Sequence, residues 1–243
     1  PGPNKESLQR LGKMVRDPGA EVGFGFDGDG GRMVPVDEKG EMAGPDRVLA
    51  AFAGYLVRAN GGGTVVTHVG ASMSVEETVE AAGGSVVRTK VGDVHVTEAM
   101  QETGAIFGGE PVGAWIHPDV HLCPDGILSA VRLMQALGSE GKTLSEFVSG
   151  IPEYPTLRSK VACPNSEKDA AMGSISDIGK EFGEVKDVST VDGVRLQLED
   201  GWVLIRPSGT EPIIRITVEA HDMARANGLM ETSKEFIQSV LGG

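Results

Sequence analysis

The sequence has only two cysteines, few aromatic residues and no long apolar run. Cys123 and Cys163 lie far apart, so they suggest neither a disulfide framework nor a zinc-binding spacing, and we interpret both as reduced thiols. No stretch of about 18 consecutive apolar residues is present, which argues against a membrane-spanning helix. The polar first residues, PGPNKE, lack the apolar core of a secretory signal. We therefore expect a globular protein of the cytoplasm, with no membrane partner.

Positive charge is also scarce. The 22 Lys and Arg residues are outnumbered by 35 Asp and Glu residues, which gives a formal net charge of -13. A general nucleic-acid-binding surface needs a basic face, so this composition argues against nucleic acid as a partner, although local basic pockets can still bind anions. With 243 residues, 40% of them hydrophobic, the chain can bury a core, and we expect at least two domains.

An acidic, glycine-rich loop lies near the start of the sequence, in the segment EVGFGFDGDGGRMVPVD from Glu21 to Asp37. Asp27 and Asp29 follow one strand-like run and precede another, and the glycines around them allow sharp bends. Two carboxylates on one side of such a loop can bind a hard cation through oxygen. Arg32 adds a positive charge beside them, which suits a ligand that carries phosphate.

Other interpretations of this loop are weaker or less specific. The run GFGFDG fits a dinucleotide-binding pattern literally, but it does not follow a strand and open a helix as that motif requires. Counting from Asp27 to Glu38 gives EF-hand-like positions, yet Arg32 stands where that loop needs glycine. A plain acidic turn stays open as an alternative on these residues alone.

A second cluster of polar groups lies near the end of the sequence, in RPSGTEP between two apolar, strand-like runs. Arg206 and Arg215 can both bind a phosphate group, and Ser208, Thr210 and the backbone amides around Gly209 can donate to its remaining oxygens. This density of donors predicts an anion-binding loop. The alternative is a surface hairpin with scattered arginines.

From residue 46 onward, helical and strand-like segments alternate, which predicts a layered α/β domain with a largely parallel sheet. Ligands of such domains collect at the carboxyl ends of the strands. Asp93 follows one of these strands, so it is a candidate binding residue. A structural alternative of equal weight is that Asp93 caps a helix that begins near Val96.

The segment IFGGEPVGAWI places Glu110 on a glycine-bounded turn after a short strand. A carboxylate held there can accept hydrogen bonds from two neighbouring hydroxyl groups of a sugar. We interpret Trp115 as a packing residue. His117 and His121 flank an aspartate in HPDVH, but no third nitrogen or sulfur ligand is evident, so a loop role is favoured over a metal site.

The remaining segments complete the expected secondary structure. A helix over residues 4–16 with Asn4 as its N-cap precedes the acidic loop, and Asp125 is expected to cap another helix. The turn-rich run GIPEYP predicts a domain boundary at residue 150. Beyond it we expect a helix over residues 166–182, an antiparallel sheet and a closing helix, which together form an α+β domain.

Three motifs in order, FDGDGGR, GGEPVGAW and RPSGTEP, resemble the α-D-phosphohexomutase family of phosphoglucomutases, phosphomannomutases and phosphoglucosamine mutases. The resemblance spans nearly the whole chain and implies the C-terminal portion of a four-domain enzyme. It implies the tail of domain 2 over residues 1–45, an α/β/α domain 3 over 46–150, and an α+β domain 4 over 151–243. The implied reaction interconverts hexose 6-phosphates and hexose 1-phosphates through a phosphoserine and a hexose 1,6-bisphosphate.

The resemblance also implies roles for the residues above. Glu110 would bind the sugar hydroxyls, and the VGD segment that contains Asp93 is similar to archaeal phosphoglucosamine mutases, which favours glucosamine phosphate over mannose or glucose phosphate as the substrate. Arg32 would act in catalysis. The other implied roles are Mg²⁺ binding by Asp27 and Asp29, and substrate phosphate binding by Arg206, Ser208, Gly209, Thr210 and Arg215 on a mobile lid.

The sequence departs from the family pattern at several points. Gly31 stands where a third metal-binding carboxylate is expected, and Val112 and Ala114 replace a serine and a histidine that are frequent in other members. No segment resembles the loop that carries the phosphoserine. We therefore expect that the other domains of the same enzyme are its partner and that this chain alone has no turnover. The alternative is a non-catalytic module that binds sugar phosphates.

Overall fold

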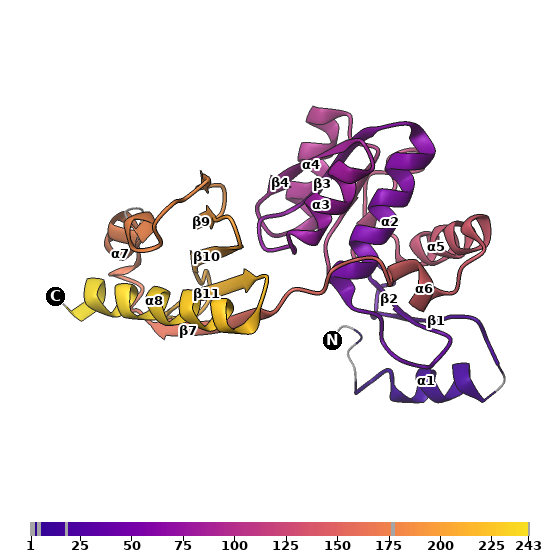
Figure 1. Cartoon of the computed structure of the whole chain (residues 1–243), viewed down its shortest axis with the longest axis horizontal. Helices are drawn as coiled ribbons and strands as arrows, with labels where there is room; N and C mark the ends of the chain where they lie inside the picture. The colour runs from indigo at the N-terminus through magenta and orange to yellow at the C-terminus, as the bar shows by residue number, and fades with distance from the viewer. Residues whose placement is uncertain (1–2, 4–5, 18, 176–177, 243) are drawn as a thin grey trace. The chain divides into compact units, whose positions relative to one another are not determined.

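The computed structural model describes residues 3, 6–17, 19–175 and 178–242. The chain divides into two compact units, Pro1–Glu153 and Tyr154–Gly243, and Figure 1 labels their elements. The first unit contains α1 (Gln9–Arg16), β1 (Gly23–Phe26), β2 (Met33–Val36), α2 (Pro45–Asn60), β3 (Gly63–His68), α3 (Ser74–Ala81), β4 (Gly84–Thr89), α4 (Asp93–Thr103), β5 (Phe107–Gly109), β6 (Trp115–Ile116), α5 (Gly126–Glu140) and α6 (Leu144–Val148). The second contains β7 (Thr156–Ala162), α7 (Lys168–Ile175), the 3₁₀ helix η1 (Ile178–Glu181), β8 (Asp187–Ser189), β9 (Val194–Gln197), β10 (Gly201–Pro207), β11 (Ile213–Ala220) and α8 (Met223–Gly242).

A helix and an antiparallel hairpin open the first unit. β1 pairs with β2, and α1 packs closely against β1: a Cβ atom on Gly23 would lie 2.6 Å from a methyl group of Val15. The predicted helix start was wrong, since α1 begins at Gln9, after a buried Leu8 that makes no side-chain cap. The expected cap, Asn4, lies outside the described residues.

The central sheet of the first unit has the strand order β4-β3-β5-β6. β3 runs parallel to β4 and β5, whereas β6 is antiparallel to β5. Successive residues of β3 point to opposite faces: Val65 joins a core with α2 and α3, and Val66 joins a separate core with α4. Helices therefore cover both faces, which confirms the predicted three-layer domain with a mainly parallel sheet (Figure 1).

Side-chain caps at two helix starts are visible in the hydrogen bonds. The backbone amide of Leu128 donates to Asp125 Oδ1 at 2.8 Å, which confirms Asp125 as the N-cap of α5. Thr143 and Glu146 form a capping box at α6. Such caps satisfy backbone N–H groups that have no partner within the helix.

The second unit is built on an antiparallel sheet with the order β7-β11-β10-β9-β8. α8 packs against β7, β10 and β11 (Figure 1), and the apolar side chains of the sheet and helices form one core. This confirms the predicted α+β domain with an antiparallel sheet. The three-part division of the chain at residues 46 and 151 stays a prediction.

The helix predicted over residues 166–182 was wrong in extent. α7 ends at Ile175, and η1 occupies Ile178–Glu181. Gly173 and Gly179 fall within the predicted span, and glycine lowers helix stability by about 1 kcal/mol relative to alanine. Ile175 and Ile178 are both fully buried and belong to the core of the second unit. Within the described ranges, no helix is both long and apolar enough to cross a membrane.

Candidate functional site

The acidic loop connects β1 to β2 and is organised by one arginine. The Arg32 backbone amide donates to Asp27 Oδ1 at 2.9 Å, and Arg32 Nε donates to Asp27 Oδ2 at 2.5 Å. Burial by itself would raise the pKa of Asp27, but these hydrogen bonds and the positive charge of Arg32 lower it below its ordinary value. Asp29 is exposed in the same loop. Arg32 therefore favours the ionised form of Asp27, and the Asp29 side chain lies close to that carboxylate.

The acidic loop is bonded to the loop that carries Glu110. Arg32 forms a β-bridge with Ala114, and the Met33 amide donates to the Gly113 carbonyl at 3.0 Å. Gly113 has a φ of +88°, and a Cβ atom there would lie 2.0 Å from the Met33 carbonyl oxygen, so only glycine permits this approach. The structure thus brings together two motifs that are about 80 residues apart in the sequence.

Glu110 is buried at the carboxyl edge of the parallel strands. Its Oε1 accepts a hydrogen bond from the Gly92 amide at 2.9 Å and lies 3.9 Å from His68 Nε2. Burial raises the pKa of Glu110 and the charge of Asp93 adds to that shift, whereas the Gly92 hydrogen bond and Arg32 oppose it. Arg32, Asp93, His68 and Glu110 therefore belong to one electrostatic cluster.

His68 was not identified from the sequence. It is the last residue of β3, and its Nδ1 accepts a hydrogen bond from the Gly70 amide at 2.9 Å. In the neutral ring the proton therefore resides on Nε2, the nitrogen that faces Glu110. The only available signal was its place at the end of a strand in a parallel sheet, where ligands collect.

Asp93 is the first residue of α4, and Gly92 is the N-cap. The predicted helix start near Val96 was wrong, because α4 begins three residues earlier. Asp93 is exposed, and a carboxylate in the first turn interacts favourably with the positive end of the helix dipole. This position leaves its side chain available to a ligand beside Glu110.

The HPDVH segment does not assemble around a common centre. His117 is buried and bonds Ser129 at 3.0 Å, Asp119 pairs with Arg132, and His121 bonds Asp125 at 3.1 Å. Burial, aided by the positive charge of Arg132, lowers the pKa of His117 from 6.5 to about 4, so its ring is neutral at pH 7.

Trp115, which follows the Glu110 turn, is a core residue. It stacks on Phe52 with a centroid distance of 4.9 Å and meets Phe107 edge-on. Only 2% of its surface is exposed, so Trp115 has a packing role and supports the turn from below.

The predicted anion-binding loop connects β10 to β11 in the second unit. Arg206 and Arg215 are direct cross-strand partners. Two like charges placed opposite each other are unfavourable, and each has its own carboxylate neighbour, Asp192 for Arg206 and Glu211 for Arg215. An anion bound between the arginines would relieve the same repulsion.

The tip of this loop combines a buried serine with exposed donors. Ser208 is 7% exposed, and its Oγ accepts a hydrogen bond from the Glu211 amide at 3.2 Å. Gly209 and Thr210 are exposed, and nothing lies within 4 Å of a Cβ atom built on Gly209. The side chain and amide of Thr210 are therefore accessible to an anion.

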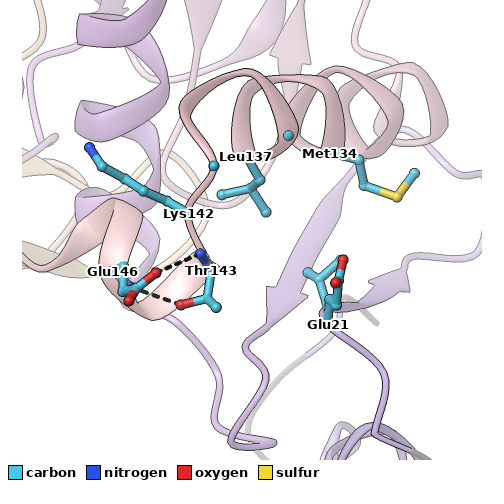
Figure 2. Close-up of a pocket in the computed structure, with 9 residues that line it drawn as sticks. Glu21, Met134, Leu137, Lys142, Thr143 and Glu146 are labelled. Atoms are coloured by element: carbon cyan, nitrogen blue, oxygen red, sulfur yellow. Dashed lines mark hydrogen bonds between the residues drawn. The ribbon is translucent and has the colours of Figure 1, made fainter.

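A cavity of about 440 Å³ lies elsewhere in the first unit, beside the second half of α5 (Figure 2). Figure 2 shows Met134 and Leu137 on α5 and the Thr143–Glu146 capping bonds near it. α5 approaches the acidic loop through its other end, where the Gly126 amide donates to Gly30. Met134 lies eight residues after Gly126 in α5. At 1.5 Å per residue, about 12 Å along the helix separates Met134 from that contact. The cavity contains none of the predicted site residues.

Comparisons with known proteins agree with this architecture. The model for the alpha/beta/alpha domain III of phosphoglucomutase/phosphomannomutase matches residues 44–154, and the model for the C-terminal domain of the same proteins matches residues 159–235. The chain belongs to the phosphoglucomutase/phosphomannomutase family. The family resemblance read from the three motifs is thereby confirmed.

Members of this family with similar sequences and structures span more than this chain. A "Probable phosphoglucosamine mutase" of Methanopyrus kandleri is 49% identical over 240 residues, which cover 99% of this chain and 52% of that relative. A phosphoglucomutase/phosphomannomutase family protein of Burkholderia thailandensis superposes with a TM-score of 0.84 at 26% identity, over 98% of this chain and 50% of that one. The chain therefore spans about half the length of its family relatives.

The fold also matches a more distant member. The N-acetylphosphoglucosamine mutase of Aspergillus fumigatus, solved in complex with GlcNAc-6P and magnesium, has a TM-score of 0.64 at 18% identity over 90% of this chain and 48% of that one. At this identity the likeness concerns the fold alone.

Proposed function

We propose that this chain supplies the sugar-binding, cation-binding and phosphate-binding groups of a phosphohexomutase that interconverts glucosamine 6-phosphate and glucosamine 1-phosphate. The observation that carries the proposal is the pairing of the acidic loop with the Glu110 loop, which places Arg32 and Glu110 in one cluster. The name of the Methanopyrus kandleri relative favours glucosamine phosphate. Mannose and glucose phosphates are the next candidates.

Glu110 binds the hydroxyl groups of the sugar ring in this proposal. Its Oε1 accepts the Gly92 amide, and Oε2 is left to accept a hydrogen bond from a hydroxyl group. Asp93 follows Gly92 as the first residue of α4. Its carboxylate can accept a hydrogen bond from the amino group that distinguishes glucosamine, because a carboxylate favours a cation. These two residues would thus select the sugar.

The acidic loop fits a weakly held Mg²⁺ ion. Mg²⁺ is commonly bound through one or two carboxylates, with water and substrate phosphate as the remaining ligands, and Asp27 and Asp29 supply two. Both oxygens of Asp27 also accept from Arg32, so the ion competes with the arginine for the same group. When bound, the ion would neutralise negative charge on the transferred phosphoryl group.

Arg32 would serve the phosphoryl transfer directly. A guanidinium can bridge phosphate oxygens as negative charge develops on them, and Arg32 has 44% of its side chain exposed although it pairs with Asp27. Its remaining N–H groups can therefore reach a phosphoryl group.

The loop in the second unit binds the phosphate that is not being transferred. Arg206 and Arg215 supply charge, and Ser208, Gly209 and Thr210 supply directional donors. The proposed phosphate is a dianion at neutral pH, which matches the cross-strand arginine pair.

The reaction itself needs a phosphoserine from a part of the enzyme beyond this sequence. A sugar hydroxyl oxygen attacks the phosphorus and gives up its proton, the bond from phosphorus to the serine oxygen breaks, the serine oxygen takes up a proton, and hexose 1,6-bisphosphate forms. The reverse transfer from the other position of the sugar regenerates the phosphoserine. The other domains of the same polypeptide are the proposed partner, and a cytoplasmic location stays a prediction.

The test is a coupled assay of the longer polypeptide that contains this chain, with glucosamine, glucose and mannose 6-phosphates, Mg²⁺ and hexose 1,6-bisphosphate. We expect the highest kcat/KM with glucosamine phosphate, and no turnover with the 243-residue chain alone. Failure of the longer protein to convert any of the three would refute the proposal. Turnover by the chain alone would refute the assignment of the nucleophile to another domain.

A non-catalytic sugar-phosphate-binding module is the second candidate. The favouring observations are Gly31 at an expected carboxylate position and the Asp27–Arg32 pairing, which occupies a potential cation ligand. Binding of glucosamine 6-phosphate without turnover in the longer protein, with or without Gly31→Asp, would favour this candidate.

A further inference from the structure

A buried lysine lies under the proposed phosphate-binding loop. Lys168 is the first residue of α7 and is only 8% exposed. Its ammonium donates to the Ser208 carbonyl oxygen at 2.5 Å and to the Glu211 carbonyl oxygen at 2.5 Å. Lysine is rarely buried unless it is paired, and its position in the first turn of a helix adds repulsion from the helix dipole. Two charge-assisted hydrogen bonds offset these costs.

The same loop segment is fixed by its own backbone as well. The Ser208 amide donates to the Ile213 carbonyl at 3.0 Å, the Ile213 amide donates to the Glu211 carbonyl at 2.8 Å, and the Cys163 amide donates to the Pro212 carbonyl at 2.9 Å. Lys168 adds the link between the two sides of the turn. Its two acceptor carbonyls, at 208 and 211, bracket Gly209 and Thr210.

The direction of the Ser208 carbonyl determines the direction of the Gly209 amide, whereas Glu211 is followed by Pro212, which has no backbone N–H group. Each peptide unit is planar, so a carbonyl that points inward to Lys168 turns the N–H of the next residue outward. The Ser208 carbonyl shares its peptide unit with the Gly209 amide. Gly209 and Thr210 are exposed, so the amide of Gly209 is presented to solvent and to any anion there.

Lys168 has no carboxylate within ion-pair distance among the residues that the structure describes. Over residues 3, 6–17, 19–175 and 178–242, its ammonium forms no ion pair within 4.0 Å, and both of its hydrogen-bond partners are carbonyl oxygens. A buried cation that lacks a carboxylate partner has an electrostatic field that extends through the loop. An anion on the outer side of the turn would be stabilised by that field.

We propose that Lys168 is a positioning residue for phosphate binding: it holds the Ser208 and Glu211 carbonyls inward, orients the Gly209 amide outward, and adds a third positive charge behind Arg206 and Arg215. This inference rests on the proposed function only in that the loop binds phosphate. The arrangement of the turn depends on Lys168 whether or not a sugar phosphate is the ligand.

The experiment compares three forms of the full chain by titration with inorganic phosphate and with glucosamine 6-phosphate, observed by ¹H–¹⁵N NMR. The forms are the parent, Lys168→Met and the matched control Lys234→Met, which removes a lysine from α8 in the same unit. We expect Lys168→Met to raise Kd for both ligands by about tenfold or more. We also expect it to move the Gly209 amide signal of the free protein, and we expect Lys234→Met to change neither.

A conservative variant separates positioning from general stability. Lys168→Arg keeps the charge and can donate to both carbonyls, so we expect it to recover most of the phosphate affinity and the parent position of the Gly209 signal. A variant that merely loosened the fold would lower the midpoint of thermal unfolding without this selective rescue. If Lys168→Met does not fold, phosphate binding by Lys168→Arg at parent affinity supports the proposal, and a tenfold loss in that variant contradicts it.

The outcomes distinguish this inference from the proposed function. Equal phosphate affinity in the parent and in Lys168→Met, with an unchanged Gly209 signal, overturns the role of Lys168 and leaves the function intact. If the parent binds inorganic phosphate but not glucosamine 6-phosphate, and Lys168→Met weakens the phosphate binding, the proposed sugar substrate fails and the positioning role stands. If the parent binds neither ligand, both proposals fail.

Discussion

Arg32 occupies both oxygens of Asp27, one through its backbone amide at 2.9 Å and the other through Nε at 2.5 Å. The Asp27 side chain is 5% exposed, whereas that of Arg32 is 44% exposed. Asp27 is therefore the buried member of the ion pair, and Arg32 is the member that a ligand can reach. A ligand that attracts Arg32 can leave Asp27 in place as an acceptor for a cation.

Replacing Arg32 should raise the pKa of Asp27. Arg32→Met removes the side-chain hydrogen bond and the charge that oppose the effect of burial. A carboxylate with a lowered pKa stabilises the fold above its unfolded pKa, and this stability is lost as the pH falls through the folded pKa. We therefore expect Arg32→Met to lose less stability than the parent as the pH falls below 3.8, the ordinary pKa of an aspartate. Carboxyl-carbon NMR titration and acid unfolding measure both effects, and Arg10→Met in α1 is the control. An unchanged Asp27 titration would contradict the assigned cause.

A carboxylate at position 31 should strengthen Mg²⁺ binding. A Cβ atom on Gly31 would lie 3.9 Å from Asp29 Oδ1 with no closer contact, so Gly31→Asp fits without displacing the loop. We expect the Kd for Mg²⁺ to fall by about tenfold, because a third carboxylate adds a charged oxygen ligand. Isothermal titration of the full chain provides the measurement. Gly150→Asp adds the same charge where a side chain is also unhindered. Equal effects of both variants would show that net charge, and not the site, is responsible.

The affinity for glucosamine 6-phosphate should depend on the ionisation of Glu110. Burial raises the pKa of Glu110 above its ordinary 4.5, so binding should strengthen as the pH rises through that raised value. Glu110→Gln keeps an acceptor for the Gly92 amide but loses the charge. We expect about tenfold weaker binding near neutral pH and no dependence on this titration, measured by calorimetry between pH 4 and 8. Glu98→Gln on α4 is the control and should show the same dependence of affinity on pH as the parent. If the affinity of Glu110→Gln still followed the parent curve, Glu110 would be excluded as the titrating group.

His68 should be the Nε2–H tautomer. Nδ1 accepts the Gly70 amide, so the proton is left on the nitrogen 3.9 Å from Glu110. Long-range ¹H–¹⁵N NMR distinguishes the two ring nitrogens directly. His68→Asn retains an acceptor for the Gly70 amide, so the loop should stay intact in this variant. Protonated Nδ1 in the parent would contradict this hydrogen-bond assignment.

His117 should make the stability of the first unit depend on pH. Its pKa is about 4 in the folded chain against 6.5 when exposed, so the neutral form stabilises the fold above pH 6.5. This contribution, up to about 3 kcal/mol, is lost as the pH falls from 6.5 to 4. His117→Phe should flatten that slope and, through the lost Ser129 bond, cost about 1 kcal/mol at pH 7. Urea unfolding across this range is the measurement, with exposed His95→Gln as the control. An undiminished slope in His117→Phe would assign the effect to another group.

Local patterns predicted much of this structure. Apolar runs between turn residues located the strands, and the side-chain oxygen of Asp125 marked a helix start because a cap is a contact between near neighbours. The glycine-rich loops were recognisable because sharp turns require residues without Cβ atoms.

The missed features depend on contacts between distant segments. Lys168 is followed by an ordinary helix, and nothing local reveals that the turn 40 residues later accepts its ammonium. His68 could not be identified as a site residue from the sequence, because its proximity to Glu110 depends on how β3 and the Gly92 loop pack in the folded chain.

The β-bridge between Arg32 and Ala114 would couple the two proposed binding events. If a cation at Asp27 displaced the Arg32 side chain and the bridge passed this change to the turn that carries Glu110, the sugar and the ion would each alter the other's dissociation constant by the same factor. The concentration of sugar needed for half-saturation would then depend on the concentration of the ion.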